Sequence, residues 1–166
     1  MKSTTAKVLH ALSGRSLVGH VLHAVNETEP RDIRVVVGAQ HSLVTEHLAE
    51  IAPQAKTVLQ EKRNGTGHAV RLALQTGEVS GTVLVTAGDT PLLTGTTLKE
   101  LLAEHIAAQA VATVLTAEVP DPFGYGRIIR DAHDELLQIV EEKDASPEIR
   151  SIAEINSGVY LFDAKA

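Results

Sequence analysis

The sequence predicts an α/β fold in which a mostly parallel, mixed sheet is flanked by helices. Aliphatic, β-branched runs alternate along the chain with segments whose apolar residues recur at helical spacing, which is the rhythm of βαβ units. Aromatic residues make up only 2% of the chain, so the core must consist of Val, Leu, Ile and Ala, as is usual around parallel strands. A length of 166 residues, 43% of them hydrophobic, suits one domain with a substantial core.

Helices and strands alternate from the start of the chain. Residues 15–26 carry apolar side chains at positions i, i+1, i+4, i+5 and i+8, which predicts a helix. The run 32–38 is rich in Val and ends at a glycine, which predicts a buried strand. The segment 42–51 begins with a Ser that can cap a helix, and Pro53 closes it. A short strand is expected at 57–59.

The rest of the chain continues this alternation and then changes character. We expect a helix at 68–75, a strand at 82–86, a helix from 96 or 97 to 109, and a strand at 111–119. After Pro120 the pattern changes to short strands and turns, with strands expected at 136–141 and 155–162. We therefore expect one domain whose last third forms a substrate lobe.

Composition excludes several classes of function. The formal net charge is −6 and no block of Lys or Arg occurs, so a nucleic-acid partner is not expected. The absence of Cys excludes disulfides, thiolate catalysis and Cys-based zinc sites. No apolar run approaches the ~20 residues that cross a bilayer, and the N-terminus does not resemble a signal peptide. We therefore expect a cytoplasmic protein without a membrane partner.

Two segments fall where open α/β sheets bind ligands, beyond the carboxyl ends of strands. The turn 60–68 contains Asn-Gly-Thr-Gly before a predicted helix, so its backbone N–H groups can approach an anionic or planar ligand. The segment 87–89, Ala-Gly-Asp, follows an apolar strand, and a carboxylate there can hold Mg²⁺. An ordinary turn and a helix-capping Asp are the alternatives at this point. The eight His residues show no spacing that predicts a metal site.

Several short segments occur in the same order as in one known enzyme family. They are 7–10 (KVLH), 59–60 (LQ), 65–69 (GTGHA), 88–92 (GDTPL), 124–128 (GYGRI), 140–145 (VEEKDA) and 154–158 (EINSG). On these motifs the chain resembles, over nearly its whole length, the N-terminal uridyltransferase domain of the bacterial bifunctional N-acetylglucosamine-1-phosphate uridyltransferase/glucosamine-1-phosphate acetyltransferase. That enzyme belongs to the sugar nucleotidyltransferase superfamily.

The resemblance implies a fold and a reaction. The fold is the Rossmann-like nucleotide-diphospho-sugar transferase fold. The reaction is Mg²⁺-dependent transfer of UMP from UTP to N-acetylglucosamine-1-phosphate, which gives UDP-N-acetylglucosamine, a precursor of peptidoglycan and the cell wall, and pyrophosphate. It further implies a nucleotide-binding part at about 1–119 and a sugar-binding part at about 120–166.

The resemblance also implies roles for individual residues. Two catalytic residues are expected: Lys7 would bind phosphate and Asp89 would bind Mg²⁺. Gln60 would face uracil, because its amide offers both a donor and an acceptor to the base edge. The other expected substrate contacts are Gly65, Thr66 and Gly88 for the nucleotide, and Gly126, Glu141 and Asn156 for the sugar.

The chain departs from the family pattern at both ends. The family opens with an apolar strand and a Leu-Ala-Ala-Gly-x-Gly-Thr-Arg-Met loop around the triphosphate, and Met1 falls where that loop would end; Ala6 replaces a usual Pro. The sequence does not contain the downstream Asn that is expected as a second Mg²⁺ ligand. It also does not contain the β-helix acetyltransferase domain, through which the relatives form trimers. We therefore expect a partial domain that lacks its first strand and is inactive as it stands.

Two other interpretations remain open. The chain could be a superfamily member that acts on thymidine, cytidine or adenine nucleotides, although Gln60 and the turn 65–69 argue against it. It could also be a non-catalytic remnant that binds a nucleotide sugar or a partner without turnover.

Overall fold

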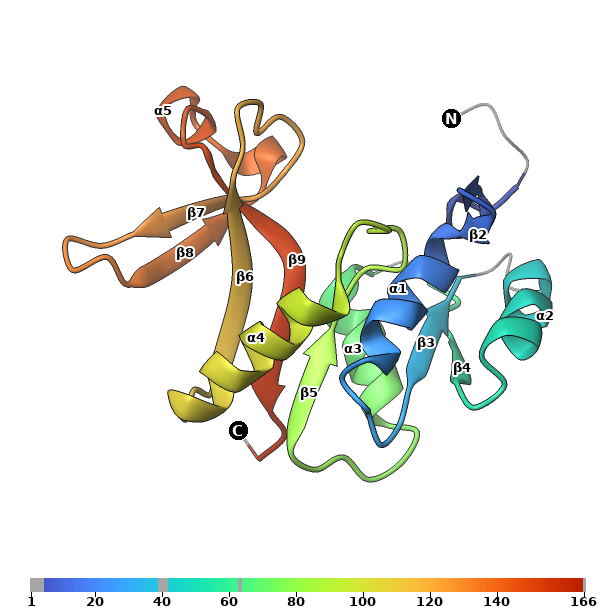
Figure 1. Cartoon of the computed structure of the whole chain (residues 1–166). Coiled ribbons are helices and arrows are strands. Elements are labelled where there is room, and N and C mark those ends of the chain that lie inside the picture. The colour runs from blue at the N-terminus through green and yellow to red at the C-terminus, as the bar shows by residue number, and fades with distance from the viewer. Residues whose placement is uncertain (1–4, 39–41, 63, 166) are drawn as a thin grey trace.

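The computed structural model describes residues 5–38, 42–62 and 64–165 (Figure 1). The helices are α1 (Leu17–Asn26), α2 (Ser42–Ile51), α3 (Thr66–Leu74), α4 (Gly95–Ala107) and α5 (Pro147–Arg150), with 3₁₀ turns η1 (Lys7–Leu9) and η2 (Glu142–Asp144). The strands are β1 (Ala11–Leu12), β2 (Arg15–Ser16), β3 (Arg34–Val37), β4 (Lys56–Leu59), β5 (Thr82–Val85), β6 (Ala112–Glu118), β7 (Arg127–Arg130), β8 (Leu136–Val140) and β9 (Glu154–Asp163).

The α/β class and the mixed sheet with flanking helices are confirmed, but parallel pairing is less common than the sequence suggested. Among the described strands, β3 and β4 pair in parallel, whereas β9 pairs antiparallel with β5, β6 and β7, and β7 pairs antiparallel with β8. Strands β5 and β6 run in the same direction and are joined through α4, yet β9 lies between them. The crossover therefore connects strands that are not neighbours.

The start of the first predicted helix is instead a short hairpin. Ser13 and Gly14 have φ values of 50° and 83°, and two successive residues in this region form the tight turn that joins antiparallel strands β1 and β2. Ser16 ends β2 and caps α1, because its Oγ accepts a hydrogen bond from the backbone N of Gly19 at 3.1 Å. The helix therefore begins at Leu17.

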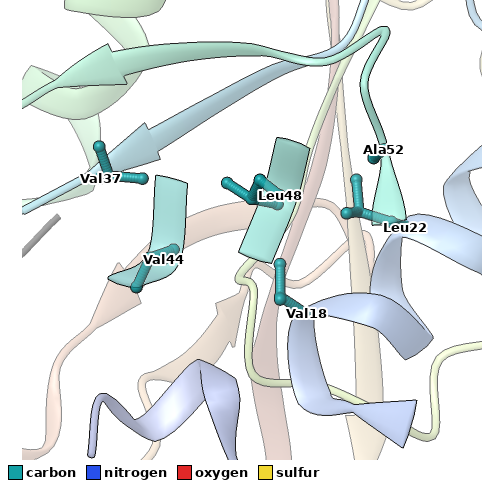
Figure 2. Packing of buried hydrophobic residues seen from close by; sticks show 6 residues of the cluster. All are labelled: Val18, Leu22, Val37, Val44, Leu48 and Ala52. Atoms are coloured by element: carbon teal, nitrogen blue, oxygen red, sulfur yellow. The ribbon is translucent and has the colours of Figure 1, made fainter. Parts of the chain in front are cut away.

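Two aliphatic clusters hold the helices against the strands. The first joins α1, α2 and β3 and consists of Val18, Leu22, Val37, Val44, Leu48 and Ala52 (Figure 2). The second joins α1, α4 and β9 and consists of Ala24, Leu98, Leu101, Val159 and Leu161. Because α1 contributes to both, it ties the β3–β4 pair to the larger sheet.

The loops that carry the predicted site residues are positioned by this framework. In Figure 1, η1 and the segment around α5 lie in the upper half of the view, the loop that follows β5 lies near its middle, and β9 ends lower down. Within the described part of the chain, no helix is both long and apolar enough to cross a membrane.

Candidate active site

Lys7 and Asp89 form an ion pair between η1 and the loop after β5. The Lys7 Nζ lies 2.5 Å from the Asp89 Oδ2, and the two side chains are 58% and 29% exposed. The hydrogen bond to Asp89, together with its negative charge, holds the pKa of Lys7 above its ordinary value, so the ammonium is charged at neutral pH. A pair this exposed contributes little to stability and can exchange partners at low cost. A flexible cation and a carboxylate are therefore available together at one point.

Gly88 precedes this carboxylate. A Cβ added there would lie 3.6 Å from Val8 Cγ1 and 3.8 Å from Val18 Cγ2, which is ordinary van der Waals contact. Packing inside the protein does not by itself require a glycine at this position.

Gln60 organises the glycine-rich turn between β4 and α3. Its Nε2 donates a hydrogen bond to the carbonyl of Gly65 at 3.2 Å and lies 3.0 Å from the Nδ1 of His68. Gly65 is the N-cap of α3 with a φ of 86°, a conformation that favours glycine, and Thr66 begins the helix. The first N–H groups of a helix lack partners within it, so this end of α3 is suited to an anionic or polar ligand. Arg63 lies outside the described residues.

Strand register brings the three predicted sugar-binding residues together. Arg127 of β7 pairs with Val140 of β8 and with Ile155 of β9. Because both pairs are antiparallel, the residue before Arg127, which is Gly126, lies beside the residues after Val140 and Ile155, which are Glu141 and Asn156.

Contacts among these three residues agree with the register. The backbone N of Asn156 donates to the Gly126 carbonyl at 2.8 Å. A Cβ on Gly126 would lie 3.3 Å from Ile139 Cγ2, 3.4 Å from Glu141 Oε1 and 3.6 Å from Asn156 Cβ. The glycine thus leaves a narrow space that one apolar and two polar side chains border.

The amide of Asn156 is held by its own strand. Its Nδ2 lies 2.6 Å from the hydroxyl of Tyr160, and its Oδ1 accepts from the backbone N of Gly158 at 3.0 Å. The register of β9 against β6 shifts at this place, between Leu115 and Thr116. Sequence reasoning missed Tyr160, although residues four apart in a strand share a face and this spacing is a usable signal.

Arg127 is the other residue near the site that sequence reasoning left without a role. Its side chain is 2% exposed and its Nη2 lies 2.8 Å from Glu142 Oε2. The hints in the sequence were its place in the motif 124–128 and its position between Gly126 and the apolar pair Ile128–Ile129.

The donor chemistry of Asp89 fits Mg²⁺. Mg²⁺ prefers hard oxygen ligands and is usually held by one or two carboxylates together with substrate phosphates. Among the residues that the structure describes, no three His, Cys, Asp or Glu side chains gather as a metal site. Asp89, next to the cation Lys7, suits a metal shared with a phosphate ligand rather than one enclosed by protein.

A cavity of about 490 Å³ lies apart from these residues, between α3, β5 and β9, and is lined mainly by apolar side chains such as Val70, Leu74 and Phe162. None of the predicted site residues lines it. The candidate site is therefore identified by its charged and polar groups and not by cavity size.

This fold, with a cation–carboxylate pair and a glycine-capped helix beyond its strands, is typical of enzymes that handle nucleotides. A sequence model described as "Nucleotidyl transferase" matches residues 2–166, and the chain belongs to this nucleotidyl transferase family.

Individual proteins of known name are similar to this chain along its whole length. The bifunctional protein GlmU of Streptomyces coelicolor is 58% identical over 168 residues, which cover 99% of this chain and 35% of that protein. The bifunctional protein GlmU of Mycobacterium tuberculosis is 46% identical over 172 residues, which cover 100% of this chain and 35% of that protein. The crystal structure of HddC from Yersinia pseudotuberculosis has a TM-score of 0.77 at 20% identity, over 99% of this chain and 70% of that one, which supports the fold. The chain thus spans about a third of the length of its curated relatives.

Proposed function

We propose that this chain is part of an enzyme that transfers UMP from UTP to N-acetylglucosamine-1-phosphate and releases pyrophosphate. The observation that carries the proposal is the strand register of β7, β8 and β9, which gathers Gly126, Glu141 and Asn156 beside one another. Backbone and side-chain hydrogen-bonding groups around a space left by glycine suit the hydroxyl and acetamido groups of a sugar. The similarity to GlmU along the whole chain favours this substrate over other sugars.

The proposed roles of the polar residues follow from their chemistry. Lys7 neutralises phosphate charge as a mobile ammonium, and Asp89 is the carboxylate for Mg²⁺. The uridine part of UTP binds to Gln60, Gly65 and Thr66, where the N-terminal end of α3 supplies N–H groups without partners inside the helix. Gly88 lets the nucleotide pass close to the backbone. This assigns residues 1–119 to the nucleotide and 120–166 to the sugar.

The reaction needs positioning more than proton transfer. The sugar phosphate is already ionised near pH 7, so its oxygen can attack the α-phosphorus of UTP without a general base, and the bond to the departing pyrophosphate breaks. Mg²⁺, when bound, supplies further neutralisation of phosphate charge. The charge of Lys7 also neutralises phosphate charge. Gly126, Glu141 and Asn156 hold the sugar and so orient the attacking phosphate. Because UTP and sugar phosphates are cytoplasmic metabolites, we place the reaction in the cytoplasm.

The test measures turnover and binding together. Pyrophosphate release from UTP, N-acetylglucosamine-1-phosphate and Mg²⁺ is followed for this chain and for any in-frame extension of its coding sequence, with CTP, dTTP and ATP compared. Calorimetry with UTP and UDP-N-acetylglucosamine is run on the same samples. Formation of UDP-N-acetylglucosamine with preference for UTP is expected in at least one of these samples. Preference for another nucleotide, or binding without turnover in every sample, would overturn the proposal.

A further inference from the structure

Arg127 connects several segments behind the candidate sugar site. It begins β7, and its guanidinium donates through Nη1 to the Tyr125 carbonyl and through Nη2 to Glu142 Oε2 at 2.8 Å and to the Arg150 carbonyl at 3.4 Å. The side chain is 2% exposed, and its buried Nε has no hydrogen-bond partner among the residues that the structure describes. One buried cation thus contacts the loop before β7, the η2 turn and α5, which gather at one corner of the molecule (Figure 1).

Glu142 is the centre of this network. Its Oε2 also accepts from the backbone N of Gly124 at 3.3 Å, and its Oε1 lies 3.3 Å from the Nε of Arg150. Arg150 further donates to the Glu142 carbonyl through Nη2 at 3.2 Å. The hydrogen bond from Arg127, followed by that from Gly124, holds the pKa of the Glu142 carboxyl below its ordinary value, so it is ionised at neutral pH.

Three members of this network, Tyr125, Arg127 and Glu142, are each one residue away from a proposed sugar-binding residue. Tyr125 precedes Gly126, and Glu142 follows Glu141. The backbone of Arg127 pairs with Ile155, which precedes Asn156. Movement of Arg127 or Glu142 would therefore change the distance between Gly126 and Glu141.

We propose that Arg127 and Glu142 are positioning residues that set the spacing of Gly126 and Glu141 for the acceptor sugar phosphate. The inference rests on the proposed function. A buried ion pair is weak support for stability, because its desolvation cost can exceed the Coulomb gain. A displacement near 1 Å in a substrate-holding residue, by contrast, can lower a reaction rate by about 100-fold. The pair therefore acts mainly on acceptor binding.

The chain contains a matched control on the same strand. Arg130 ends β7, and its guanidinium binds Glu154 of β9 twice, with Nη2–Oε1 at 2.7 Å and Nε–Oε2 at 2.9 Å. This pair also joins β7 to another element, but Arg130 is 36% exposed, against 2% for Arg127. The hydrogen bonds of the Arg130 side chain go to Glu154 and Asp134 and not to the proposed sugar residues. Arg130→Lys and Glu154→Gln thus report the effect of losing an Arg–Glu pair from β7 without disturbing the site.

The experiment compares Arg127→Lys and Glu142→Gln with these two controls in the active form of the protein. We expect the KM for N-acetylglucosamine-1-phosphate to rise at least tenfold in both site variants, the KM for UTP to stay within twofold, and both controls to match the parent. Calorimetry with UDP-N-acetylglucosamine and with UTP tests whether affinity for the sugar compound falls while affinity for UTP is kept. Thermal unfolding verifies that the variants fold. If Arg127→Lys does not fold, Glu142→Gln, which keeps the side-chain shape, decides alone.

Three results would overturn the inference. Site variants that match the controls would show that the pair has no positioning role. Equal changes toward UTP and the sugar phosphate would indicate a general structural effect. If the parent protein shows neither activity nor affinity for any N-acetylglucosamine compound, both the proposed function and this inference are wrong. That result is measured on the parent alone, so it can be distinguished from the first two, which concern the variants.

Discussion

The Lys7 Nζ lies 2.5 Å from the Asp89 Oδ2, so the cation proposed for phosphate and the carboxylate proposed for Mg²⁺ share one point of the structure. The two residues come from segments far apart in the sequence, η1 and the loop that follows β5. Because both side chains are accessible, each can turn to a ligand without unfolding anything. Their pairing makes the proposed roles of Lys7 and Asp89 testable together.

Asp89→Asn should lower the rate of UDP-N-acetylglucosamine formation by about 100-fold or more, because a metal's stabilisation of transition-state charge is worth several kcal/mol. Unfolding should change little, since the Lys7–Asp89 pair is exposed. The pKa of Lys7, followed by NMR, should also fall toward its ordinary value because Asp89 is the main cause of its rise. Asp134→Asn is the control, since Asp134 lies in the β7–β8 turn with a φ of 65° that Asn tolerates. Turnover by Asp89→Asn within tenfold of the parent would rule out the metal role.

Gln60→Ala should weaken UTP binding by about 1–2 kcal/mol, the usual cost of leaving a desolvated polar edge without its hydrogen bonds. The structure adds a competing explanation, because the Gln60 amide also holds the turn through Gly65 and His68. Calorimetry with UTP, CTP and ATP separates the two. A loss confined to UTP supports contact with uracil, whereas equal losses for all nucleotides mean that Gln60 acts by shaping the turn. Gln75→Ala, at the exposed C-cap of α3, is the control.

Local sequence patterns predicted many elements well. The helix expected at 42–51 is α2, Ser42–Ile51, and the strand expected at 32–38 contains β3, Arg34–Val37. These elements are fixed by neighbouring residues, through the period of their apolar side chains and their capping or breaking residues. Their existence therefore follows from segments of ten residues or fewer.

Pairing partners could not be predicted in the same way. Nothing within the segment 154–163 indicates that it inserts antiparallel between β5 and β6, because that choice depends on strands distant in the sequence. The Arg127–Glu142 contact was missed for the same reason, since it follows from the folding of η2 and α5 over the start of β7. The grouping of Gly126, Glu141 and Asn156 was expected only from the resemblance, and the strand register supplies its physical cause.

Gly67→Ala should stabilise the fold while weakening nucleotide binding. Gly67 lies in the first turn of α3, its φ is not positive, and a Cβ there would meet nothing within 4 Å. Alanine is a better helix former than glycine, so the free energy of unfolding should rise by about 0.5 kcal/mol. If UTP approaches this open backbone closely, the new methyl group should reduce its affinity several-fold. Urea unfolding and calorimetry give the two values, and unchanged UTP affinity would mean that the nucleotide does not approach Gly67.

The free energy of unfolding should fall as the pH drops below about 4.5, and Glu154→Gln should make that fall less steep. Hydrogen bonding to Arg130 holds the pKa of Glu154 below its ordinary value, and Arg34 does the same for Asp32. A carboxyl group whose pKa is lowered in the folded state stabilises the fold at pH values above its unfolded pKa, which is near 4 for these groups. It loses that contribution as the pH falls through its folded-state pKa.

Urea unfolding between pH 3 and 7 measures the free energy of unfolding of the parent, of Glu154→Gln and of the α2 surface variant Glu50→Gln. Glu154→Gln should be less stable than the parent at pH 7 and should approach it near pH 3, and 0.5 M salt should reduce the difference because the pair is partly exposed. A difference between these two proteins that stays constant across the pH range would mean that Glu154 acts through packing and not through its charge.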